Sequence, residues 1–309
     1  MKKEDSVIIR EVVMRDGLQS IPAFVETSDK LELIRKIALA GVKVLEITSF
    51  VSPKAIPQLK DAAEVLNGAR GLGPALDVLV PNITGAMRAL SEMPDRLVVF
   101  VSASESHNRA NVGMSIDDSM KQLEKVFEMA REKDVPVTSA IAVSFGCPYE
   151  GNVPRDRVLS IAKRFFESGV DIITLGDTTG MASPNRIKDL TGFILNSLPD
   201  ARLCLHLHNN RGIAMANLYE GYREGIRIFD AALGGIGGCP NVPKAAGNLC
   251  TEDVVFMFDE MGVETGIDLM KLIEASHALE TLLGYTLPGQ VMKSGPRDPE
   301  LARRCTAAH

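Results

Sequence analysis

Two histidines two positions apart, His206 and His208, are the side chains of this chain best suited to chemistry. They alternate with apolar residues in Leu203–His208, a pattern typical of a short β-strand, on which residues two apart point to the same face. Two adjacent neutral imidazoles indicate half of a site for Zn, Mn, Fe or a related ion, because imidazole suits these metals. A lone histidine would more often be a hydrogen-bonded core residue, but this pair is two of only five histidines.

Short β-rich runs alternate with longer amphipathic segments, and the alternation repeats eight times. This repetition predicts a parallel sheet, and eight units predict an α/β fold of the (β/α)8 TIM-barrel type before an open doubly wound sheet. No GxGxxG motif follows the first strand, which removes the main argument for a Rossmann fold. The expected strands are Val7–Val13, Val44–Thr48, Leu76–Val80, Leu97–Ser102, Val137–Val143, Ile172–Leu175, Leu203–His208 and Ile228–Ala231. The expected helices are Ser28–Ala40, Asp61–Gly68, Ile83–Ser91, Ile116–Lys133, Pro154–Ser168, Asn185–Ser197, Ile213–Glu224 and Glu252–Met261, with Ser28 and Ser115 as caps.

Chemistry in such a barrel is expected where the strands end and the βα loops begin. Polar or ionisable residues follow nearly every predicted strand, which packing alone does not explain. In chain order they are Arg15, Asp16 and Gln19; Glu46 and Thr48; Ser102, Ser104 and Glu105; Gly146-Cys147-Pro148; Asp177 and Thr178; Arg211; and Gly234–Cys239 followed by Asn248.

Closure of the barrel makes the first and eighth strands neighbours and puts the seventh beside the eighth. Asp16, His206, His208 and Asn248 can therefore converge although they are far apart in the chain. One carboxylate, two imidazoles and an amide oxygen, without a thiolate, favour Mg²⁺ or Mn²⁺ in an octahedral shell, with Zn²⁺ as an alternative. Taken singly, Asp16 would also fit a turn carboxylate and Asn248 a helix cap, so the set carries the prediction.

The composition of the chain argues against several classes of partner and location. A net charge of −6 argues against nucleic acid or an anionic membrane as the main partner. No apolar stretch approaches the ~20 residues of a membrane span, and the first residues lack a signal-peptide core. Five cysteines, an odd number without a CxxC pair, are typical of reduced intracellular thiols. We therefore expect a cytoplasmic protein.

The whole chain, residues 1–309, is expected to form one catalytic domain, with the barrel over about 5–262 and a helical extension over 263–309. Asp268–Leu283 predicts a further helix, and the polar, proline-containing Ser294–His309 predicts a loosely ordered tail. The apolar faces of Val254–Met261 and Leu269–Leu283 suggest a homodimer or higher homo-oligomer, although core packing explains them equally well.

The motifs of this chain, in their order, resemble those of the 3-hydroxy-3-methylglutaryl-CoA lyases. They also resemble the wider group of metal-dependent TIM-barrel lyases and synthases, which includes isopropylmalate, homocitrate and citramalate synthases. The similarity covers most of the chain, from Val7 to the helix at Asp268. The segments concerned are Glu11–Gln19, Leu45–Lys54, Gly146–Gly151, Leu175–Thr178, His206–His208, and Gly237–Pro240 through Gly247–Asp253.

This resemblance implies a retro-Claisen cleavage, in which a 3-hydroxyacyl-CoA with a tertiary alcohol yields acetyl-CoA and a keto acid. For 3-hydroxy-3-methylglutaryl-CoA the keto acid is acetoacetate, which implies a place in leucine degradation and ketone-body formation. It also implies that the four converging residues bind the divalent cation. The other implied roles are Arg15 for neutralising the thioester enolate, Glu46 and Asp177 for proton traffic, Cys239 as a mobile acid/base, and Gln19, Ser144, Thr178 and Arg211 for substrate binding.

Several of these residues also admit a structural role. Arg15 would also pair with Glu46, and Asp177 would also cap a helix. Cys147 and Cys204 are better explained as buried small apolar residues than as nucleophiles. Cys239 differs, because a cysteine in a glycine-rich loop fills no core. The remaining candidates, His107 and Cys305, are expected at the surface.

Three departures leave the acyl group open. The lyases have Asp-Thr-Tyr-Gly where this chain has Asn209–Gly212, Ser104–Val112 resembles the synthase branch, and Asn241–Ala246 replaces a Tyr/Phe-Ala pair. Citramalyl-CoA or a longer 3-hydroxy-3-alkylglutaryl-CoA is therefore an alternative substrate, with Arg211 on a differently placed carboxylate.

Three other functions compete with a lyase. A condensing synthase would not need the Cys239 thiol, and no regulatory domain follows the barrel. A barrel that only binds acyl-CoA would not need the metal set. An aldolase acting on a free hydroxy acid stays open, because CoA recognition leaves no strong motif and Lys54 is only a weak phosphate-binding candidate.

Overall fold

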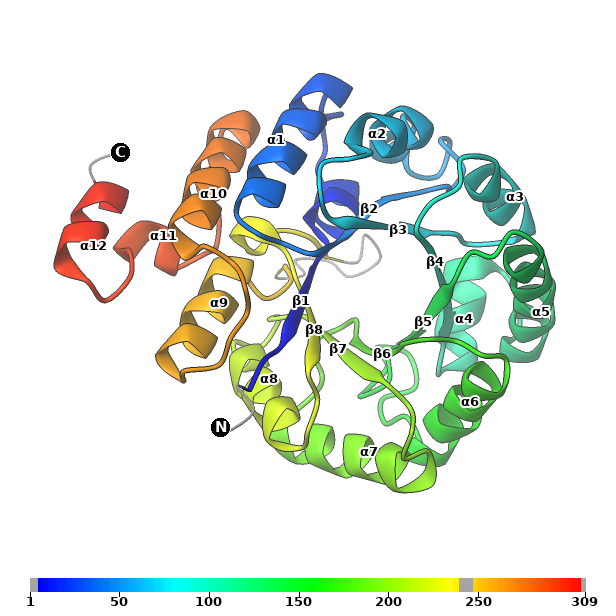
Figure 1. The fold of residues 1–309 in the computed structure, drawn as a ribbon. Coiled ribbons are helices and arrows are strands. Elements are labelled where there is room, and N and C mark those ends of the chain that lie inside the picture. Colours follow the sequence, from blue (N-terminus) through cyan, green and yellow to red (C-terminus); the bar gives the residue numbers. More distant parts are fainter. Residues whose placement is uncertain (1–4, 239–246, 307–309) are drawn as a thin grey trace.

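The computed structural model describes residues 5–238 and 247–306, which form a closed barrel of eight parallel strands in sequential order. Figure 1 looks along the barrel, with the strands in the middle and the helices around them. Pairs from Ile8–Ile228 to Glu11–Ala231 join the first strand to the last and close the barrel. The strands are β1 (Ile8–Glu11), β2 (Val44–Ser49), β3 (Ala75–Leu79), β4 (Arg96–Ser102), β5 (Val137–Ala142), β6 (Ile173–Asp177), β7 (Leu203–Leu207) and β8 (Ile228–Ala231).

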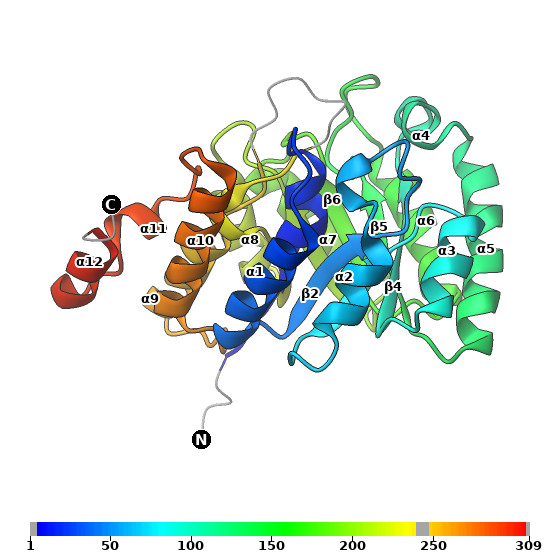
Figure 2. The same cartoon turned by 90° about the horizontal axis from the view of Figure 1, so that it is seen from above.

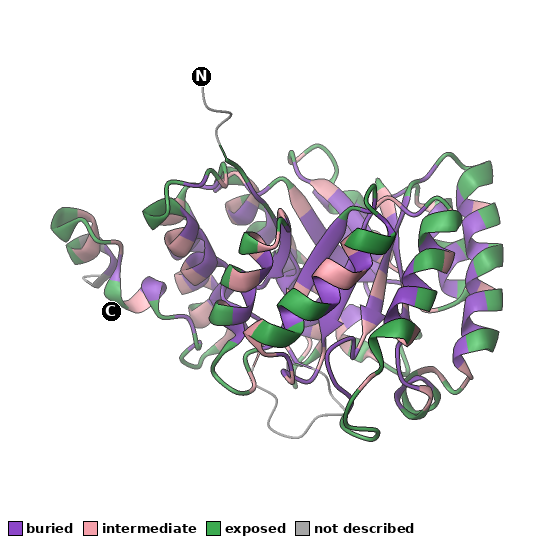
Figure 3. Ribbon diagram, turned by 90° about the horizontal axis from the view of Figure 1, so that it is seen from below, coloured by how far each residue is buried: buried purple, intermediate pink, exposed green. Residues whose placement is uncertain are grey.

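The predicted TIM barrel is therefore confirmed, with each strand within a few residues of its expected bounds. Every residue of β6 and β8 is buried, because helices cover the outer face of the barrel while side chains fill its interior. Figure 3 shows the strands in the colour of buried residues and the outer faces of the helices in that of exposed ones.

Helices follow the strands around the barrel and cover its outside. Ser115 caps α5 by accepting a hydrogen bond from the Asp118 amide, as expected. The expected cap at Ser28 is wrong, because α1 begins one residue earlier and Glu26 precedes it. The helices are α1 (Thr27–Leu39), α2 (Ala62–Ala69), α3 (Ile83–Ser91), α4 (Glu105–Val112), α5 (Ile116–Glu132), α6 (Arg155–Glu167), α7 (Pro184–Ser197), α8 (Ala214–Arg223), α9 (Thr251–Glu260), α10 (Leu269–Leu283), α11 (Val291–Ser294) and α12 (Pro299–Thr306), with short 3₁₀ turns η2 (Pro57–Leu59) and η3 (Leu233–Gly235).

Two of the unpredicted helical segments at the carboxyl ends of the strands matter for the site. The chain expected to continue β1 instead turns into a π-helix, η1 (Val13–Gly17), in which the amides of Arg15, Asp16 and Gly17 all donate to the Val12 carbonyl. The other is α4, which is polar and lacks the apolar periodicity that marks the longer helices.

The C-terminal helices pack on one side of the barrel. Figures 1 and 2 show α10 beside α1 and α9 beside α10, with α11 and α12 farther out. The expectation of a loosely ordered tail fails for α12, whose start is stabilised by Asp298 accepting from the Glu300 and Leu301 amides. Cys305 on this helix is buried, not at the surface as expected. Among the described residues no helix is both long and apolar enough to cross a lipid bilayer.

Candidate functional site

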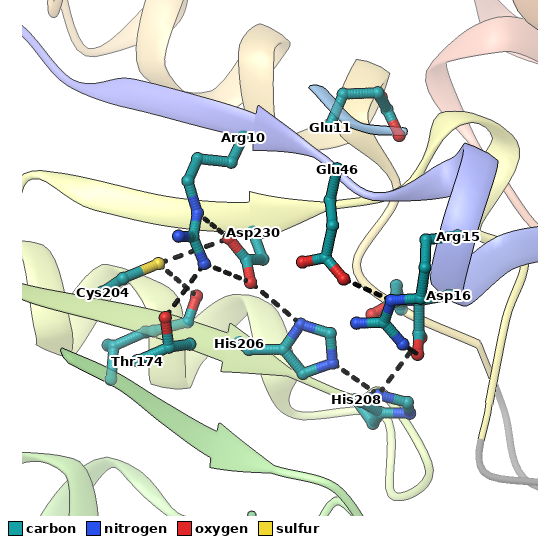
Figure 4. Close-up of polar contacts among 12 residues, drawn as sticks. Arg10, Glu11, Arg15, Asp16, Glu46, Thr174, Cys204, His206, His208 and Asp230 are labelled. Atoms are coloured by element: carbon teal, nitrogen blue, oxygen red, sulfur yellow. Dashed lines mark hydrogen bonds and ion pairs between the residues drawn. The ribbon is translucent and has the colours of Figure 1, made fainter. Parts of the chain in front are cut away.

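Asp16, His206 and His208 form a cluster at the carboxyl ends of β1 and β7. Their ligand atoms all lie within 4.8 Å of one another, and all three residues are buried or nearly so. The π-turn of η1 places Asp16 beside the two histidines, while the two-residue strand period puts both imidazoles on the same side of β7 (Figure 4). The expected convergence of these three side chains is therefore present.

The two imidazoles face each other through Nε2 atoms that lie 2.9 Å apart. Two ligands on one ion at ~2.1 Å and at right angles lie about 3 Å from each other, so this spacing suits neighbouring positions of an octahedral shell. Asp16 Oδ2 lies 3.8 Å from His208 Nε2, on the same side. The donor set therefore fits a divalent cation.

Asn248 reaches the cluster because residues 247–249 run beside the end of β7. The Asn209 amide donates to the Gly247 carbonyl, and His208 and Asn248 are partners in an antiparallel bridge. The Asn248 Nδ2 group donates to Asp16 Oδ2 at 2.7 Å, while its Oδ1 is buried without a hydrogen-bond partner among the described residues. That unpaired oxygen is the atom a cation would take.

Gly237 has to be glycine for this arrangement to form. Its φ is +118°, and a Cβ there would lie 2.4 Å from Asn248 Nδ2 and 3.1 Å from Asp16 Oδ2. Any side chain would therefore push Asn248 and Asp16 out of the cluster.

Arg15 lies between two carboxylates at the edge of the cluster. Its guanidinium donates from Nε to Glu46 on β2 and from Nη1 to Asp16, while Gln19 Nε2 donates to Asp16 Oδ1 at 2.8 Å. Arg15, Asp16, Gln19 and Glu46 also line one cavity of about 390 Å³. The pair between Arg15 and Glu46 that was expected as a structural alternative is thus present, and it leaves the guanidinium facing the cavity.

The charges set the protonation states of the cluster. Burial alone would raise the pKa of Asp16, but Arg15 and the two imidazoles hold it well below its ordinary value. Burial, together with the neighbouring His206, lowers the pKa of His208 to about 4. An ionised Asp16 and a neutral His208 are the forms that bind a cation.

A second layer of side chains, not predicted as part of the site, supports His206. Asp230 on β8 has its Oδ2 3.1 Å from His206 Nδ1 and accepts two hydrogen bonds from Arg10 on β1, at 2.7 and 2.9 Å. Arg10 also donates to Thr174 Oγ1, at 2.9 Å. The available signal was the placement of Arg10 and Asp230, which are charged residues inside short, mostly apolar strands.

Asp177 lies at the end of β6, outside the lining of the cavity. Its Oδ1 accepts from the Met181 and Ala182 amides, so it organises the turn before α7. It does not cap that helix, contrary to its structural alternative, because the N-cap residue of α7 is Ser183. Burial raises the pKa of Asp177 to about 6, and Oδ2 has no hydrogen-bond partner among the described residues. This carboxyl can therefore exchange a proton near neutral pH.

Of the remaining residues predicted to bind substrate, only Thr178 lines the cavity. Its Oγ1 accepts from the Val143 amide. Ser144 Oγ donates to the Ile141 carbonyl, and Arg211 Nη1 donates to the carbonyls of Thr179 and Gly180. Neither of these two residues lines the cavity.

The cysteines and His107 differ in their relation to the cavity. Cys239 lies outside the described residues. Cys147 and Cys204 are buried, as expected, with the Cys147 thiol 3.0 Å from Ser104 Oγ and the Cys204 thiol 3.3 Å from Asp230. His107, expected at the surface, is instead buried in the lining of the cavity. The cause is the unpredicted α4, which turns this side chain inward.

Comparison with known proteins adds three findings. The HMGL-like family model matches residues 6–279. The chain is 39% identical over 292 residues to the hydroxymethylglutaryl-CoA lyase YngG of Bacillus subtilis, covering 93% of this chain and 98% of the relative. It is also 39% identical over 308 residues to the (R)-citramalyl-CoA lyase of Chloroflexus aurantiacus, covering 96% and 97%.

Among solved structures, an HMG-CoA lyase from Acinetobacter baumannii in complex with coenzyme A and 3-methylmalate superposes with a TM-score of 0.93. It is 40% identical, and the match covers 97% of this chain and 98% of that one.

Proposed function

The chain belongs to the HMGL-like family of carbon–carbon lyases, and we propose that it splits a 3-hydroxyacyl-CoA by a retro-Claisen reaction, with 3-hydroxy-3-methylglutaryl-CoA as the leading substrate. One observation carries this proposal. The Asp16, His206 and His208 cluster and the Arg15 guanidinium share one end of a single cavity. A cation site for the hydroxyl and an arginine for the product enolate are two of the groups that this cleavage needs.

Asp16, His206, His208 and the unpaired Oδ1 of Asn248 would hold the cation, with Mg²⁺ or Mn²⁺ favoured and Zn²⁺ as the alternative. When bound, the ion supplies Lewis acidity that makes the tertiary hydroxyl of the substrate easier to deprotonate. The residues of the chain then perform the remaining steps.

The reaction balances without a further reagent. Loss of the hydroxyl proton lets the oxygen form a carbonyl at C3, the C2–C3 bond breaks, and its electron pair passes to the thioester as an enolate. A proton added at C2 gives acetyl-CoA, and the C3 fragment leaves as acetoacetate. The site therefore needs one group that accepts a proton, one that donates a proton, and one cation that stabilises the enolate.

Arg15 is proposed to stabilise the enolate. Its guanidinium is fixed by Glu46 and Asp16 before substrate binds, so little reorganisation is required as negative charge develops. It can still offer N–H groups to the cavity, because guanidinium carries five.

Proton transfer is assigned to three residues. Asp177 has a pKa near the working pH and an unpaired Oδ2, and Glu46 already contacts Arg15 in the cavity. Cys239 is proposed as the mobile acid/base near C2, on the basis of the family motif alone.

The comparisons leave the acyl group open, since an HMG-CoA lyase and a citramalyl-CoA lyase are equally identical to this chain. Both substrates carry a tertiary hydroxyl and a free carboxylate that can reach the same cluster. We propose 3-hydroxy-3-methylglutaryl-CoA first and citramalyl-CoA second. The 3-methylmalate in the Acinetobacter baumannii relative is also a hydroxy acid, and it makes a useful binding probe for this chain.

The test is a mass-spectrometric assay of acetyl-CoA release with Mg²⁺ or Mn²⁺, comparing the two acyl-CoAs in the native protein and in Cys239→Ser and His206→Ala. Rapid cleavage of 3-hydroxy-3-methylglutaryl-CoA that both substitutions abolish supports the leading proposal. Preference for citramalyl-CoA keeps the mechanism and changes the substrate. Release of acetyl-CoA from neither would contradict both, and consumption of acetyl-CoA with a 2-oxo acid would identify a condensing synthase.

A further inference from the structure

One wall of the cavity is formed by the unpredicted helix α4, which presents His107 to it. Asn111, one turn farther along, and Val112 line the same wall. β4, which leads into α4, lies opposite β8 in the closed barrel, so this wall faces the metal cluster across the mouth. His107 has no part in the mechanism described above.

Among the described residues the imidazole of His107 is hydrogen-bonded through only one of its nitrogens, and its ring centroid lies 6.1 Å from that of Tyr149. The Nδ1 atom of His107 lies 2.7 Å from Ser102 Oγ, and the residue is only 5% exposed. Its Nε2 makes no hydrogen bond to any described residue, although the ring lies in the cavity lining. One ring nitrogen is thus anchored, and the other is available to a bound molecule.

α4 itself is rigidly attached. Ser104 caps it by accepting from the His107 amide, at 3.1 Å. Asn108 is fully buried and accepts from the Ser102 amide, while its Nδ2 donates to the carbonyls of Met114 and Ser115. His107 is therefore presented by a fixed element.

The surroundings of His107 indicate what it would bind. The neighbouring lining is mostly apolar, and the two arginines in the lining are already paired, Arg15 with Glu46 and Arg10 with Asp230. Burial lowers the pKa of His107, so its ring is neutral. Among the described residues the lining thus leaves no unpaired cation beside this neutral imidazole, which suits an uncharged group better than a carboxylate.

A second polar atom in the cavity also lacks a partner. Ser49 Oγ, at the end of β2, is buried and accepts or donates no hydrogen bond among the described residues. Buried polar atoms of this kind are costly unless something pairs with them. The cavity thus has unpaired neutral groups as well as the charged end.

We infer that His107 is a substrate-binding and specificity-determining residue, whose Nε2 hydrogen-bonds an uncharged carbonyl or amide group of the thioester arm of the acyl-CoA. This inference rests on the proposed function. The hydroxyl and carboxylate of the substrate belong to the cluster, so the part that crosses toward α4 is the thioester and the pantetheine arm. The polar groups of that arm are uncharged carbonyls and amides.

Three substitutions test the contact, with kcat and KM measured separately on the preferred acyl-CoA. His107→Phe keeps the ring shape and removes both nitrogens, and we expect KM to rise about 3- to 10-fold with kcat changed less than twofold. His107→Gln places its amide near the Nε2 position and should restore KM to within twofold. His107→Asn places its amide near Nδ1, beside Ser102, and should behave like the Phe variant.

Shortened substrates identify the group that is bound. A methyl thioester of the same acid keeps the thioester carbonyl and lacks the pantetheine amides. Equal sensitivity of this compound to His107→Phe locates the contact at the thioester carbonyl, whereas loss of the sensitivity locates it at a pantetheine amide.

If the protein cleaves neither acyl-CoA, the dissociation constant of acetyl-CoA measures the same contact without turnover. The assignment of His107 is overturned if His107→Phe binds and cleaves like the native protein. It is also overturned if the Phe, Gln and Asn variants are equally impaired and share a lowered melting temperature or a weaker Mn²⁺ affinity, which would make His107 a structural residue.

Discussion

The Nδ1 atom of His206 lies 3.1 Å from Oδ2 of Asp230, so the carboxylate of one strand orients a ring of the next. If Nδ1 carries the proton, the lone pair of Nε2 is directed toward His208 and Asp16. Burial alone would raise the pKa of Asp230, but Arg10 and His206 hold it well below its ordinary value. An ionised partner of this kind fixes the histidine tautomer and increases the basicity of the ligand atom.

Asp230→Asn should therefore weaken metal binding. The expected loss of Mn²⁺ affinity is about 10- to 100-fold, measured by isothermal titration calorimetry, because the ring loses its anionic partner. The variant also leaves the Arg10 charge buried without a counter-ion, which would cost about 3–5 kcal/mol of unfolding free energy.

The double variant Arg10→Met with Asp230→Asn is the matched control for that stability loss. It removes the stranded charge, so the unfolding free energy should recover while Mn²⁺ binding stays weak. Recovery of both would mean that Asp230 acts on stability alone.

Adding metal should stabilise the fold. At 100 times its dissociation constant, Mn²⁺ is expected to add about 2.7 kcal/mol to the unfolding free energy, seen as a rise in melting temperature that EDTA reverses. Asp16→Asn should largely remove the rise, because the amide has lost the charge that attracts the ion. A full rise in this variant would place the bound metal elsewhere.

Arg15→Gln should lower kcat at least about 100-fold, since the enolate would form without its cation. Arg15→Lys keeps the charge but not the two-sided contact with Glu46 and Asp16, so we expect an intermediate kcat. Equal Mn²⁺ affinity in both variants and the native protein would separate this effect from damage to the metal cluster. An unchanged kcat in the Gln variant would exclude Arg15 from the chemistry.

Because of Glu11, the free energy of unfolding should decrease as the pH rises, which is unusual for a carboxylate. Glu11 is the last residue of β1, is buried, and accepts hydrogen bonds from the Val13 and Leu233 amides and from Thr251 Oγ1. Burial raises its pKa from 4.5 to about 8. Between these values the folded state holds a proton that the unfolded state has lost, so its contribution is full below pH 4.5 and declines as the pH rises to 8.

Glu11→Gln tests this directly without a titrating group, because the amide oxygen can accept from the Val13 and Leu233 amides while the amide NH2 donates to Thr251 Oγ1, the reverse of the native direction. Urea midpoints at pH 5.5 and 8.5 should differ less in the variant than in the native protein, and the variant should be the more stable of the two at pH 8.5. The buried Glu252 also has a raised pKa and contributes in the same direction, so part of the native dependence should persist. An unchanged pH dependence would show that Glu11 does not titrate in this range.

Local sequence patterns were sufficient for the order of the barrel. Short β-rich runs alternate with amphipathic helices, and eight such units in that order favour a closed parallel sheet over an open doubly wound one. His206 and His208 were also predictable as neighbours, because the strand period that places them side by side is a local property.

The tertiary structure decided which residues lie behind His206 and orient it. Asp230 is 24 residues from His206 and Arg10 is 220 residues from Asp230, and their contacts depend on the register of β7, β8 and β1. Register results from packing across the whole barrel, so no local pattern reports it.

The burial of His107 was likewise not predictable from a local pattern. Its segment is short and polar, so periodicity gave no sign of a helix, and a surface loop was the natural expectation. Its burial follows from Asn108, which ties α4 to β4 and to the start of α5. The sequence alone determined which residues could do chemistry and on which strands they lie, whereas the packing of distant segments decided which of them meet in one cavity.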